Sequence, residues 1–294
     1  MKKTMILLTS MMLLTACQKQ DTFTGQVDNG DEIVISCQDN LSITRQKVYE
    51  DLASSYGANY LVNLALQKAA SFEEIDNEKV NQEVENTIET YKTLMGDDLD
   101  AYAKANLGFD TFETYKEKVL VPSMRQKLMI ENYSEENFEK LAKENSYVKL
   151  RMIKVNDQQT AVTVIGKISS DEISFEDAVK EYSTDSTTKS KNGELGVVSI
   201  LSTNVDSSIA SLTPQLTAVA LYSAPVTLSD GTYAIIDVQE TDINVLKDDI
   251  LKDLKANDSI TQEAEAFYLN KYNFKVSDSV LKKAVQEINK DYIK

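Results

Sequence analysis

The chemistry open to this sequence is limited first by what it lacks, because its 294 residues include two cysteines and no histidine. Histidine is the usual general base near neutral pH and a frequent zinc ligand, so Ser-His-Asp catalysis, Cys-His catalysis and most catalytic zinc sites are excluded. The net charge of −16 disfavours binding to nucleic acid, where phosphate groups supply the main attraction. We therefore expect neither a hydrolase nor a nucleic-acid-binding protein, and no metal or organic cofactor.

The first cysteine, Cys17, follows an apolar run near the N-terminus. Lys2 and Lys3 precede Met5–Leu14, which is about half of the ~20 residues that a membrane-spanning helix needs, so the run predicts an export signal. The sequence Leu14-Thr15-Ala16-Cys17 comes directly after it.

This stretch resembles the lipobox of bacterial lipoproteins, in which the cysteine receives a diacylglyceryl group and becomes the first mature residue. It predicts a signal peptide over 1–16, a lipidated Cys17, and a polar tether over 17–32 at the extracytoplasmic face of a Gram-positive type of cell membrane. An ordinary signal peptide with an accidental cysteine is the alternative.

The second cysteine, Cys37, ends the apolar run Ile33–Ser36. A buried thiol in a short strand is its expected state. Lipidation of Cys17 would leave Cys37 without a partner, so no disulfide framework is expected.

Residues 33–145 predict one helix after another. Two sets of apolar residues recur at helical spacing: Val80, Val84, Ile88, Tyr91 and Met95, and then Val48, Leu52, Tyr56, Tyr60 and Leu64. Capping residues are expected at Thr44, at Ser71 with Glu74, and at Asp110 with Glu113.

Residues 147–241 predict a small α+β domain. Val148, Leu150 and Met152 alternate with polar neighbours, which indicates a strand. Ser174 is expected to cap a helix over Phe175–Tyr182, a loop should follow over 183–196, and a closing hairpin is expected near 225–240.

Residues 242–294 return to helical spacing, but this segment is too short to bury its own apolar stripes. We expect it to pack on the first helical segment. The predicted fold class is therefore α+β, with a multi-helix lobe built from both ends of the chain and the small α+β domain inserted between them.

The inserted domain resembles the parvulin-type peptidyl-prolyl isomerases. Phe175–Asp185 followed by Asn192–Gly196 is similar to the family's signature F-x-x-L-A-x-x-Y-S-x-D … G-G-x-L-G. Val148–Val155 and Tyr233–Val238 are similar to the family's first and last strands. Together with the lipobox and the flanking helices, the whole chain resembles the PrsA-type foldase lipoproteins of Gram-positive bacteria.

This resemblance implies where an isomerase site would lie. In parvulins two histidines, from the first and last strands, lie beneath a Cys or Asp, and a Met and a Phe line the proline pocket. The acidic position falls on Asp185 and a loop leucine on Leu195. The first histidine position falls on Arg151, and the second on Ala234 or Tyr233.

The Met and Phe positions fall near Thr203 and Ser207, where the sequence is polar. With both histidines missing, the expectation is weak or no isomerase activity. An active peptidyl-prolyl cis-trans isomerase is the alternative, because twisting an amide depends on shape and electrostatic field more than on proton transfer.

The resemblance also implies a chaperone function, since the helical parts of the PrsA family are thought to hold unfolded exported proteins. Flexible Met and amphipathic Tyr suit such surfaces. The candidates for contact with client proteins are Tyr56, Tyr60, Met95, Phe112, Tyr115, Met124 and Met129. The alternative for each of these residues is that it is buried in the helical core. The sequence does not indicate the oligomeric state. A solute-binding protein or an adhesin is a third possibility.

Overall fold

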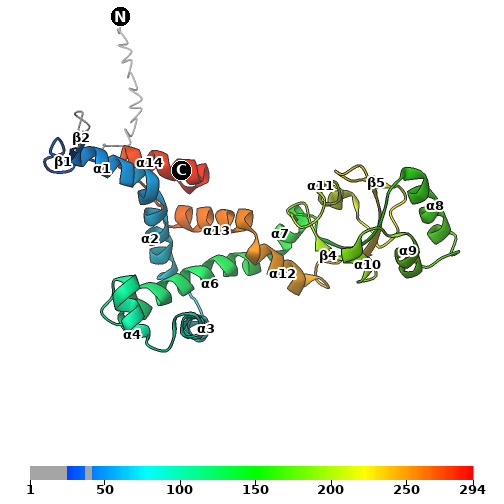
Figure 1. The fold of residues 1–294 in the computed structure, drawn as a ribbon, viewed down its shortest axis with the longest axis horizontal. Helices are drawn as coiled ribbons and strands as arrows, with labels where there is room; N and C mark the ends of the chain where they lie inside the picture. Colours follow the sequence, from blue (N-terminus) through cyan, green and yellow to red (C-terminus); the bar gives the residue numbers. More distant parts are fainter. Residues whose placement is uncertain (1–24, 37–41, 294) are drawn as a thin grey trace, which may run out of the picture. The chain divides into compact units, whose positions relative to one another are not determined.

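The computed structural model describes residues 25–36 and 42–293, and the chain forms two compact units (Figure 1). The first unit consists of the chain up to Ala65 together with the chain from Asn270 onward, and the second unit is Leu66–Leu269. Cys17 and Cys37 both lie outside the described residues. The chain combines many helices with two antiparallel sheets, so the α+β class is confirmed.

The first unit combines a two-stranded sheet with helices from both ends of the chain. Strands β1 (Ile33–Ser36) and β2 (Ser42–Thr44) pair antiparallel, and α1 (Arg45–Leu52) follows directly. Thr44 caps α1, as the sequence predicts, by accepting a hydrogen bond from the backbone N–H of Lys47 at 3.2 Å. A π-helical turn over Ala53–Gly57 joins α1 to α2 (Ala58–Ala70), and α14 (Ser279–Ile288) packs against that turn (Figure 1).

The buried carboxylate of Asp278 holds both ends of the chain together in the first unit. It accepts hydrogen bonds from the Gly25 N–H at 2.5 Å and the Tyr49 hydroxyl at 2.9 Å, and it also caps α14. A Cβ atom at Gly25 would lie 2.2 Å from the Tyr49 hydroxyl oxygen, so any other residue there would displace the Tyr49 side chain. The sequence predicted a tether up to residue 32, whereas the chain is fixed to the folded unit from Gly25.

Replacing Asp278 with alanine is expected to destabilise the first unit by about 3 kcal/mol, because buried donors lose a charged acceptor and α14 loses its cap. Hydrogen exchange of the α14 amides measures this loss. Asp291→Ala is the matched control, since that exposed residue in the same unit should change stability by less than about 0.5 kcal/mol. Unchanged exchange in Asp278→Ala would contradict the assignment.

The same carboxylate should make the first unit sensitive to acid. Burial opposes ionisation of Asp278, but the hydrogen bonds from Leu281, Tyr49, Gly25 and Val280 outweigh it and lower its pKa. A carboxyl group with a lowered folded-state pKa stabilises the fold above its unfolded-state pKa of about 3.9 and loses that contribution as the pH falls. Protection of α14 should therefore decrease below about pH 4, and less so in Asp278→Ala.

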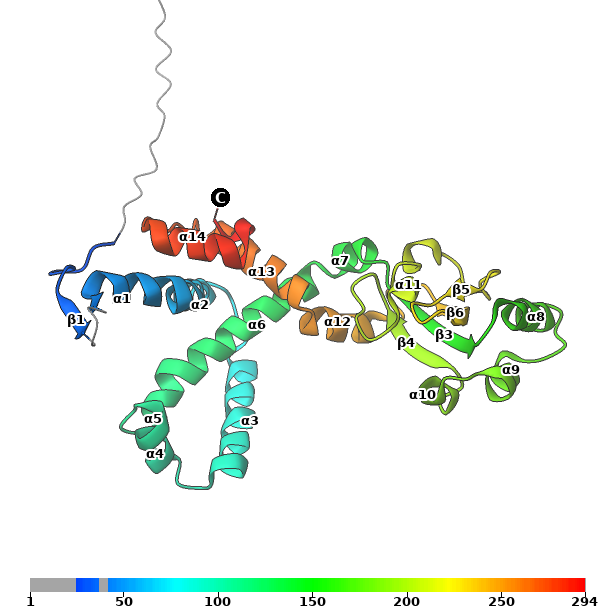
Figure 2. The same ribbon diagram turned by 45° about the horizontal axis from the view of Figure 1, so that its top comes forward.

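The second unit contains the remaining helices. Its first part comprises α3 (Asn77–Met95), α4 (Leu99–Tyr102), α5 (Phe112–Tyr115), α6 (Val121–Glu136) and α7 (Phe138–Glu144). Helices α3 and α6 contact each other, and α4 and α5 lie at the end of that pair (Figure 2). Val80, Val84 and Ile88 are buried on α3, as their spacing predicts.

Two predicted caps are wrong. Ser71 follows the end of α2, where its backbone N–H donates to the Gln67 and Lys68 carbonyls, and Asp76 caps α3 instead. The cap of α5 is Thr111 rather than Asp110. Both errors arise because Ser, Thr and Asp at neighbouring positions can each cap a helix, and the spacing to a Glu does not choose between them.

The C-terminal helices of the second unit are α12 (Lys247–Ala256) and α13, whose range Asp258–Lys271 continues into the first unit. Helix α12 packs on α6 and α7, and the Tyr147 hydroxyl donates to Asp253 at 2.6 Å. The Tyr133 hydroxyl likewise donates to Glu263 on α13 at 2.7 Å. The chain after the sheet therefore packs on helices that precede it.

We call Val148–Glu240 the sheet region. Its four strands are β3 (Val148–Val155), β4 (Glu194–Val198), β5 (Val226–Thr227) and β6 (Tyr233–Glu240), all antiparallel in the order β4-β3-β6-β5. The helices of this region are α8 (Gln158–Ser169), α9 (Phe175–Tyr182), α10 (Ser186–Lys189) and α11 (Ser207–Ala210). Strand β4 and helix α10 lie where the sequence predicted a loop.

Two apolar clusters cover the two faces of this sheet. One contains Met152 and Ile236 with Ile209 of α11, and we call that side the α11 face. The other contains Ile153 and Ile235 with residues of α8 and α9, and we call it the α8–α9 face. Ser174 caps α9 as predicted, accepting from the Asp177 N–H at 3.1 Å.

Candidate functional site

The alternation of residues along β3 decides which site residues can meet. Met152 belongs to the cluster on the α11 face, and Ile153 to the cluster on the α8–α9 face. Arg151 lies opposite Asp237 of β6, and Ala234 lies opposite Lys154. Because successive residues of a strand point to opposite faces, Arg151 is on the α8–α9 face and Ala234 on the α11 face.

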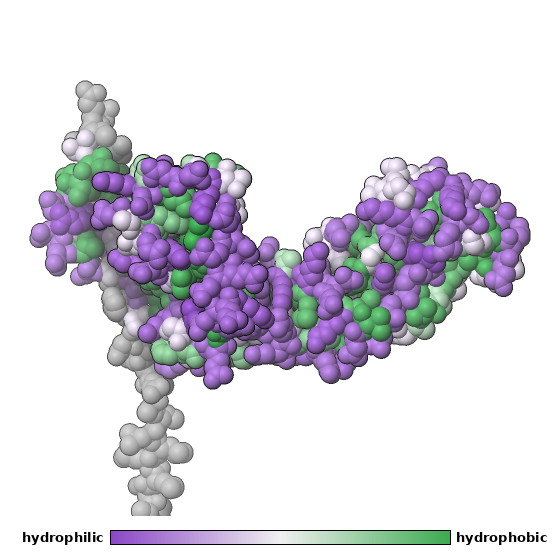
Figure 3. All heavy atoms as spheres, turned by 90° about the horizontal axis from the view of Figure 1, so that it is seen from below, coloured by the Kyte–Doolittle hydropathy of each residue, from purple (hydrophilic) through white to green (hydrophobic). Residues whose placement is uncertain are grey.

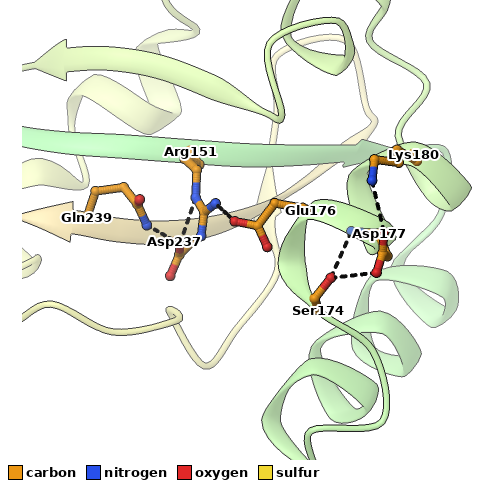
Figure 4. A network of polar contacts seen from close by, with 7 residues as sticks. All are labelled: Arg151, Ser174, Glu176, Asp177, Lys180, Asp237 and Gln239. Carbon is orange, nitrogen blue, oxygen red and sulfur yellow. Dashed lines mark hydrogen bonds and ion pairs between the residues drawn. The ribbon is translucent and has the colours of Figure 1, made fainter.

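Arg151 forms an ion network on the α8–α9 face (Figure 4). Its guanidinium donates to Asp237 at 3.0 and 2.7 Å, pairs with Glu176 of α9, and lies 4.5 Å from the centre of the Phe175 ring. Its side chain is 15% exposed and that of Asp237 14%. The hydrogen bond from Arg151 lowers the pKa of Glu176. These contacts tie β3, β6 and α9 together.

Asp185 has other partners. It caps α10 by accepting from the Thr188 backbone N–H at 3.0 Å and from the Thr188 hydroxyl at 2.5 Å. Burial opposes its ionisation, but these hydrogen bonds prevail and lower its pKa. Both of these hydrogen bonds are local to its own helix, whereas Arg151 pairs with Glu176 and Asp237.

The sheet separates the other expected site residues. Leu195 packs on the α11 face, whereas Tyr233 packs on the α8–α9 face. Thr203 and Ser207, at the expected proline pocket, are exposed. Arg151, Leu195 and Tyr233 thus do not form one site around Asp185, because two of the three lie on one side of the sheet and Leu195 on the other.

The register of β3 explains this result. Met152, rather than Arg151, lies on the same face as Ala234, together with Leu195, Tyr222 and Val226 at the edge of the cluster. Sequence reasoning did not select Met152, although the Val148-Leu150-Met152 alternation already separated it from Arg151. A shift of one residue along a strand exchanges the two faces.

The α11 face can bind an apolar group but offers little for chemistry. Met152 is 8% exposed, Ala234 is buried completely, and the partly exposed residues at the edge include Leu195, Val205, Tyr222 and Val226. Within the described ranges, no group of three or more Cys, Asp or Glu side chains could hold a metal ion. The residues of this cluster are therefore suited to contact with an apolar ring or side chain.

Gly193, in the motif Asn192–Gly196, holds the turn between α10 and β4 close to β3. Its φ is +85°, its carbonyl accepts from the Met152 N–H at 2.8 Å, and an added Cβ would lie 2.7 Å from the Met152 carbonyl oxygen. The left-handed backbone and this close approach both require glycine.

Replacing Gly193 with alanine should therefore destabilise the sheet region by about 2 kcal/mol or more, the cost of the left-handed backbone plus the clash. Gly166→Ala is the matched control, because that glycine lies inside α8 with open space around it. Alanine there should stabilise the helix by about 0.8 kcal/mol. Urea denaturation monitored by circular dichroism should show opposite shifts, and shifts of the same sign would refute this account.

The residues expected to contact client proteins differ in how exposed their side chains are. Tyr56 is 71% exposed, Tyr60 64% and Met95 47%. Phe112 and Met129 are buried, which corrects the expectation that they contact clients, and Tyr115 is half-buried with its hydroxyl 3.0 Å from that of Tyr91. Met124 is also half-buried. Helical spacing cannot distinguish an exposed stripe from a buried one.

An apolar groove lies beside the exposed tyrosines in the first unit. It has a volume of about 460 Å³ and is lined by Tyr49, Leu52, Ala53, Tyr56, Gly57, Tyr60, Leu61 and Leu281.

None of the helices in the described ranges is long and apolar enough to cross a membrane.

Comparisons with known proteins agree with the motif in the sheet region. Residues 153–240 match the family model described as Rotamase, a PPIC-type PPIase domain. The foldase protein PrsA of Bacillus subtilis (strain 168) is 30% identical over 194 residues, which cover 64% of this chain and 59% of that protein. The foldase protein PrsA 2 of Bacillus cereus (strain ATCC 14579) is 25% identical over 292 residues, covering 94% and 92%.

The chain is also similar to a solved structure of the peptidylprolyl isomerase PrsA from Bacillus cereus. The TM-score is 0.49 and the sequence identity 23%, and the match covers 88% of this chain and 99% of that chain. The matched residues 153–240 contain the signature Phe175–Asp185 and all of β6, and they begin inside β3, after Arg151. The chain is thus similar to the PrsA-type foldases, and residues 153–240 match a parvulin-type domain.

Proposed function

We propose that this protein is a lipid-anchored extracytoplasmic foldase that binds unfolded or partly folded exported proteins, and that its parvulin-type domain has little or no isomerase activity. The foldase function is inferred from the similarity of the chain to the PrsA foldases. The mode of action rests on one observation, the exposed apolar stripe of the first unit.

That stripe consists of Leu52, Tyr56, Tyr60 and Leu64, all of them exposed. No charged residue occurs from Leu52 to Gln67, although 27% of the chain is charged. On the face drawn in Figure 3, by comparison, hydrophilic residues cover most of the surface. A contiguous apolar surface on a folded protein usually marks a binding site, and Tyr and Leu suit apolar segments of varied sequence.

The proposal of weak isomerase activity rests on the separated site. A catalyst of prolyl isomerisation must favour a twisted amide over the planar one, whose conjugation sets a barrier of ~18–20 kcal/mol for ordinary amides. The chain has no histidine, and Arg151 and Tyr233 lie on the opposite side of the sheet from Leu195. The apolar α11 face is suited to holding a side chain without polarising its amide.

Anchoring through Cys17 is proposed from the lipobox. Two acyl chains on one cysteine are needed for stable attachment, since a single chain gives only marginal membrane binding. The test is the location of the expressed chain: wild type should be in the membrane fraction, and Cys17→Ser in the soluble fraction. A soluble wild type would refute the anchoring.

The experiment for the foldase function is suppression of aggregation. A chemically denatured exported protein is diluted with or without the chain lacking residues 1–17, and light scattering is followed. We expect slower aggregation at equimolar chain, independent of proline content in the client. No effect at a severalfold excess would refute client binding.

An active isomerase remains the second candidate function. The observation in its favour is the PPIC-type match over 153–240, with Asp185 at the acidic position of the motif. Catalysis that disappears in Asp185→Ala would support it.

A further inference from the structure

We infer that strand β1 of the first unit contacts the phospholipid surface to which the protein is attached. This inference rests on the proposed anchoring at Cys17. It concerns Ile33, Val34 and Ile35, which are 57%, 46% and 47% exposed. These three residues take no part in the groove or stripe assigned to clients.

The position at which the chain enters the first unit limits its distance from the membrane. Gly25 is buried, its N–H donates to Asp278 at 2.5 Å, and its carbonyl accepts from the Gln46 side chain at 2.8 Å. Seven residues then separate Cys17 from Gly25. Eight Cα–Cα steps span at most about 28 Å, so the first unit must remain within that distance of a lipid-bound cysteine.

Strand β1 belongs to the part of the first unit nearest in sequence to this entry point. The turn between them is fixed to α1, because the Arg45 N–H donates to the Glu32 carbonyl and the Gln46 N–H to the Gly30 carbonyl, both at 2.9 Å. Glu32 also forms an ion pair with Arg45. The strand is therefore held close to the residue at which the lipid-bound segment begins.

The exposure of β1 fits a lipid surface better than a protein surface. Successive residues of a strand point to opposite faces, so three consecutive exposed aliphatic residues leave both faces of β1 uncovered. A rigid protein partner covers one face, whereas the region between headgroups and acyl chains surrounds both. Water remains available there for the backbone groups at the edge of β1 that no described strand pairs, so the contact must be shallow.

The net charges of the two units favour the first unit as the one that contacts the membrane. Residues 25–65 and 270–294 contain 8 basic and 9 acidic residues, a net charge of −1. Residues 66–269 contain 20 basic and 37 acidic residues, a net charge of −17. Anionic lipid repels the second unit strongly and the first unit hardly at all.

The absence of tryptophan from the chain allows a direct test. Val34→Trp introduces a single indole into the lipidated full-length chain, which is then reconstituted in phosphatidylcholine vesicles. We expect a blue-shifted emission that is strongly quenched by brominated acyl chains. Val245→Trp is the matched control, because Val245 is a 67% exposed valine in the second unit and its indole should keep a water-like, unquenched emission.

Flotation of the vesicles separates the two possible failures. A chain that does not float refutes the anchoring at Cys17 and this inference with it. A chain that floats but shows a water-like Val34→Trp emission overturns only the membrane contact. A blue shift that appears without vesicles and grows with protein concentration would assign β1 to a second copy of the chain, and would also overturn it.

Discussion

Replacing Arg151 with methionine is expected to lower the free energy of unfolding of the sheet region by about 3 kcal/mol. The substitution removes the only guanidinium that pairs Asp237 and Glu176 within the described residues. Asp237 is 14% exposed and would keep the Gln239 amide as a partner but no opposite charge, whereas Glu176 is 45% exposed and should contribute little. Urea denaturation followed by circular dichroism measures the change.

Two further variants give this prediction its specificity. Lys180→Met breaks the pair with Asp177, whose side chains are 65% and 63% exposed, and should cost less than about 0.5 kcal/mol. Combining Arg151→Met with Asp237→Leu removes both charges and should recover most of the stability. If Arg151→Met is as stable as wild type, the network is not structural. If it is stable but loses an isomerase activity that wild type has, Arg151 belongs to a catalytic site.

The second large effect is expected from the exposed stripe. Replacing Tyr56 and Tyr60 together with serine should weaken client binding by about 2 kcal/mol, or roughly 30-fold, because two large apolar surfaces are lost from the contact. Suppression of aggregation by the chain lacking residues 1–17 should then require a correspondingly higher concentration. The free energy of unfolding should stay within about 0.5 kcal/mol of wild type, since both rings are exposed in the folded chain.

The matched control replaces two exposed valines of the second unit. Val162 and Val219 are 50% and 59% exposed, and the double substitution to serine should leave client binding unchanged. Equal loss in both double variants would mean that general surface hydrophobicity, rather than the stripe, binds the client. If Tyr56→Ser/Tyr60→Ser binds the client as tightly as wild type, the stripe is not the client-binding site.

The sequence alone predicts most of the regular structure. Helical spacing indicates α3, and alternation indicates β3, because local periodicity reflects the geometry of each element. Caps succeed where a single candidate is available, as at Thr44 and Ser174, and fail where several polar residues adjoin, as at Ser71.

The sequence alone could not predict which apolar residues are exposed. Leu52, Tyr56, Tyr60 and Leu64 have the spacing of a buried helical face, yet all four are exposed in the first unit. Periodicity identifies residues that share a face, whereas burial depends on whether another element covers that face. The same limitation placed Phe112 and Met129 among the surface candidates, although both fill the helical core.

The candidate site was predicted in its motif but not in its geometry. The stretch Phe175–Gly196 lies within the residues that match the PPIC-type domain, but the strand position carried over from the family is Arg151, which is next to Met152. Because neighbouring residues of β3 face opposite clusters, Arg151 lies on the α8–α9 face, whereas Met152 and Leu195 lie on the α11 face. The pairing of Arg151 with Asp237 depends on the register between β3 and β6, residues distant in sequence.

We propose that the parvulin-type domain of this protein is a scaffold for binding and not an efficient catalyst. The most direct test is the cis-to-trans isomerisation of a short X-Pro peptide in the presence of the chain lacking residues 1–17. We expect the uncatalysed time course, tens to hundreds of seconds at 25 °C, at every protein concentration tested. A rate that rises in proportion to protein concentration, and falls to the uncatalysed value in Asp185→Ala, would contradict it.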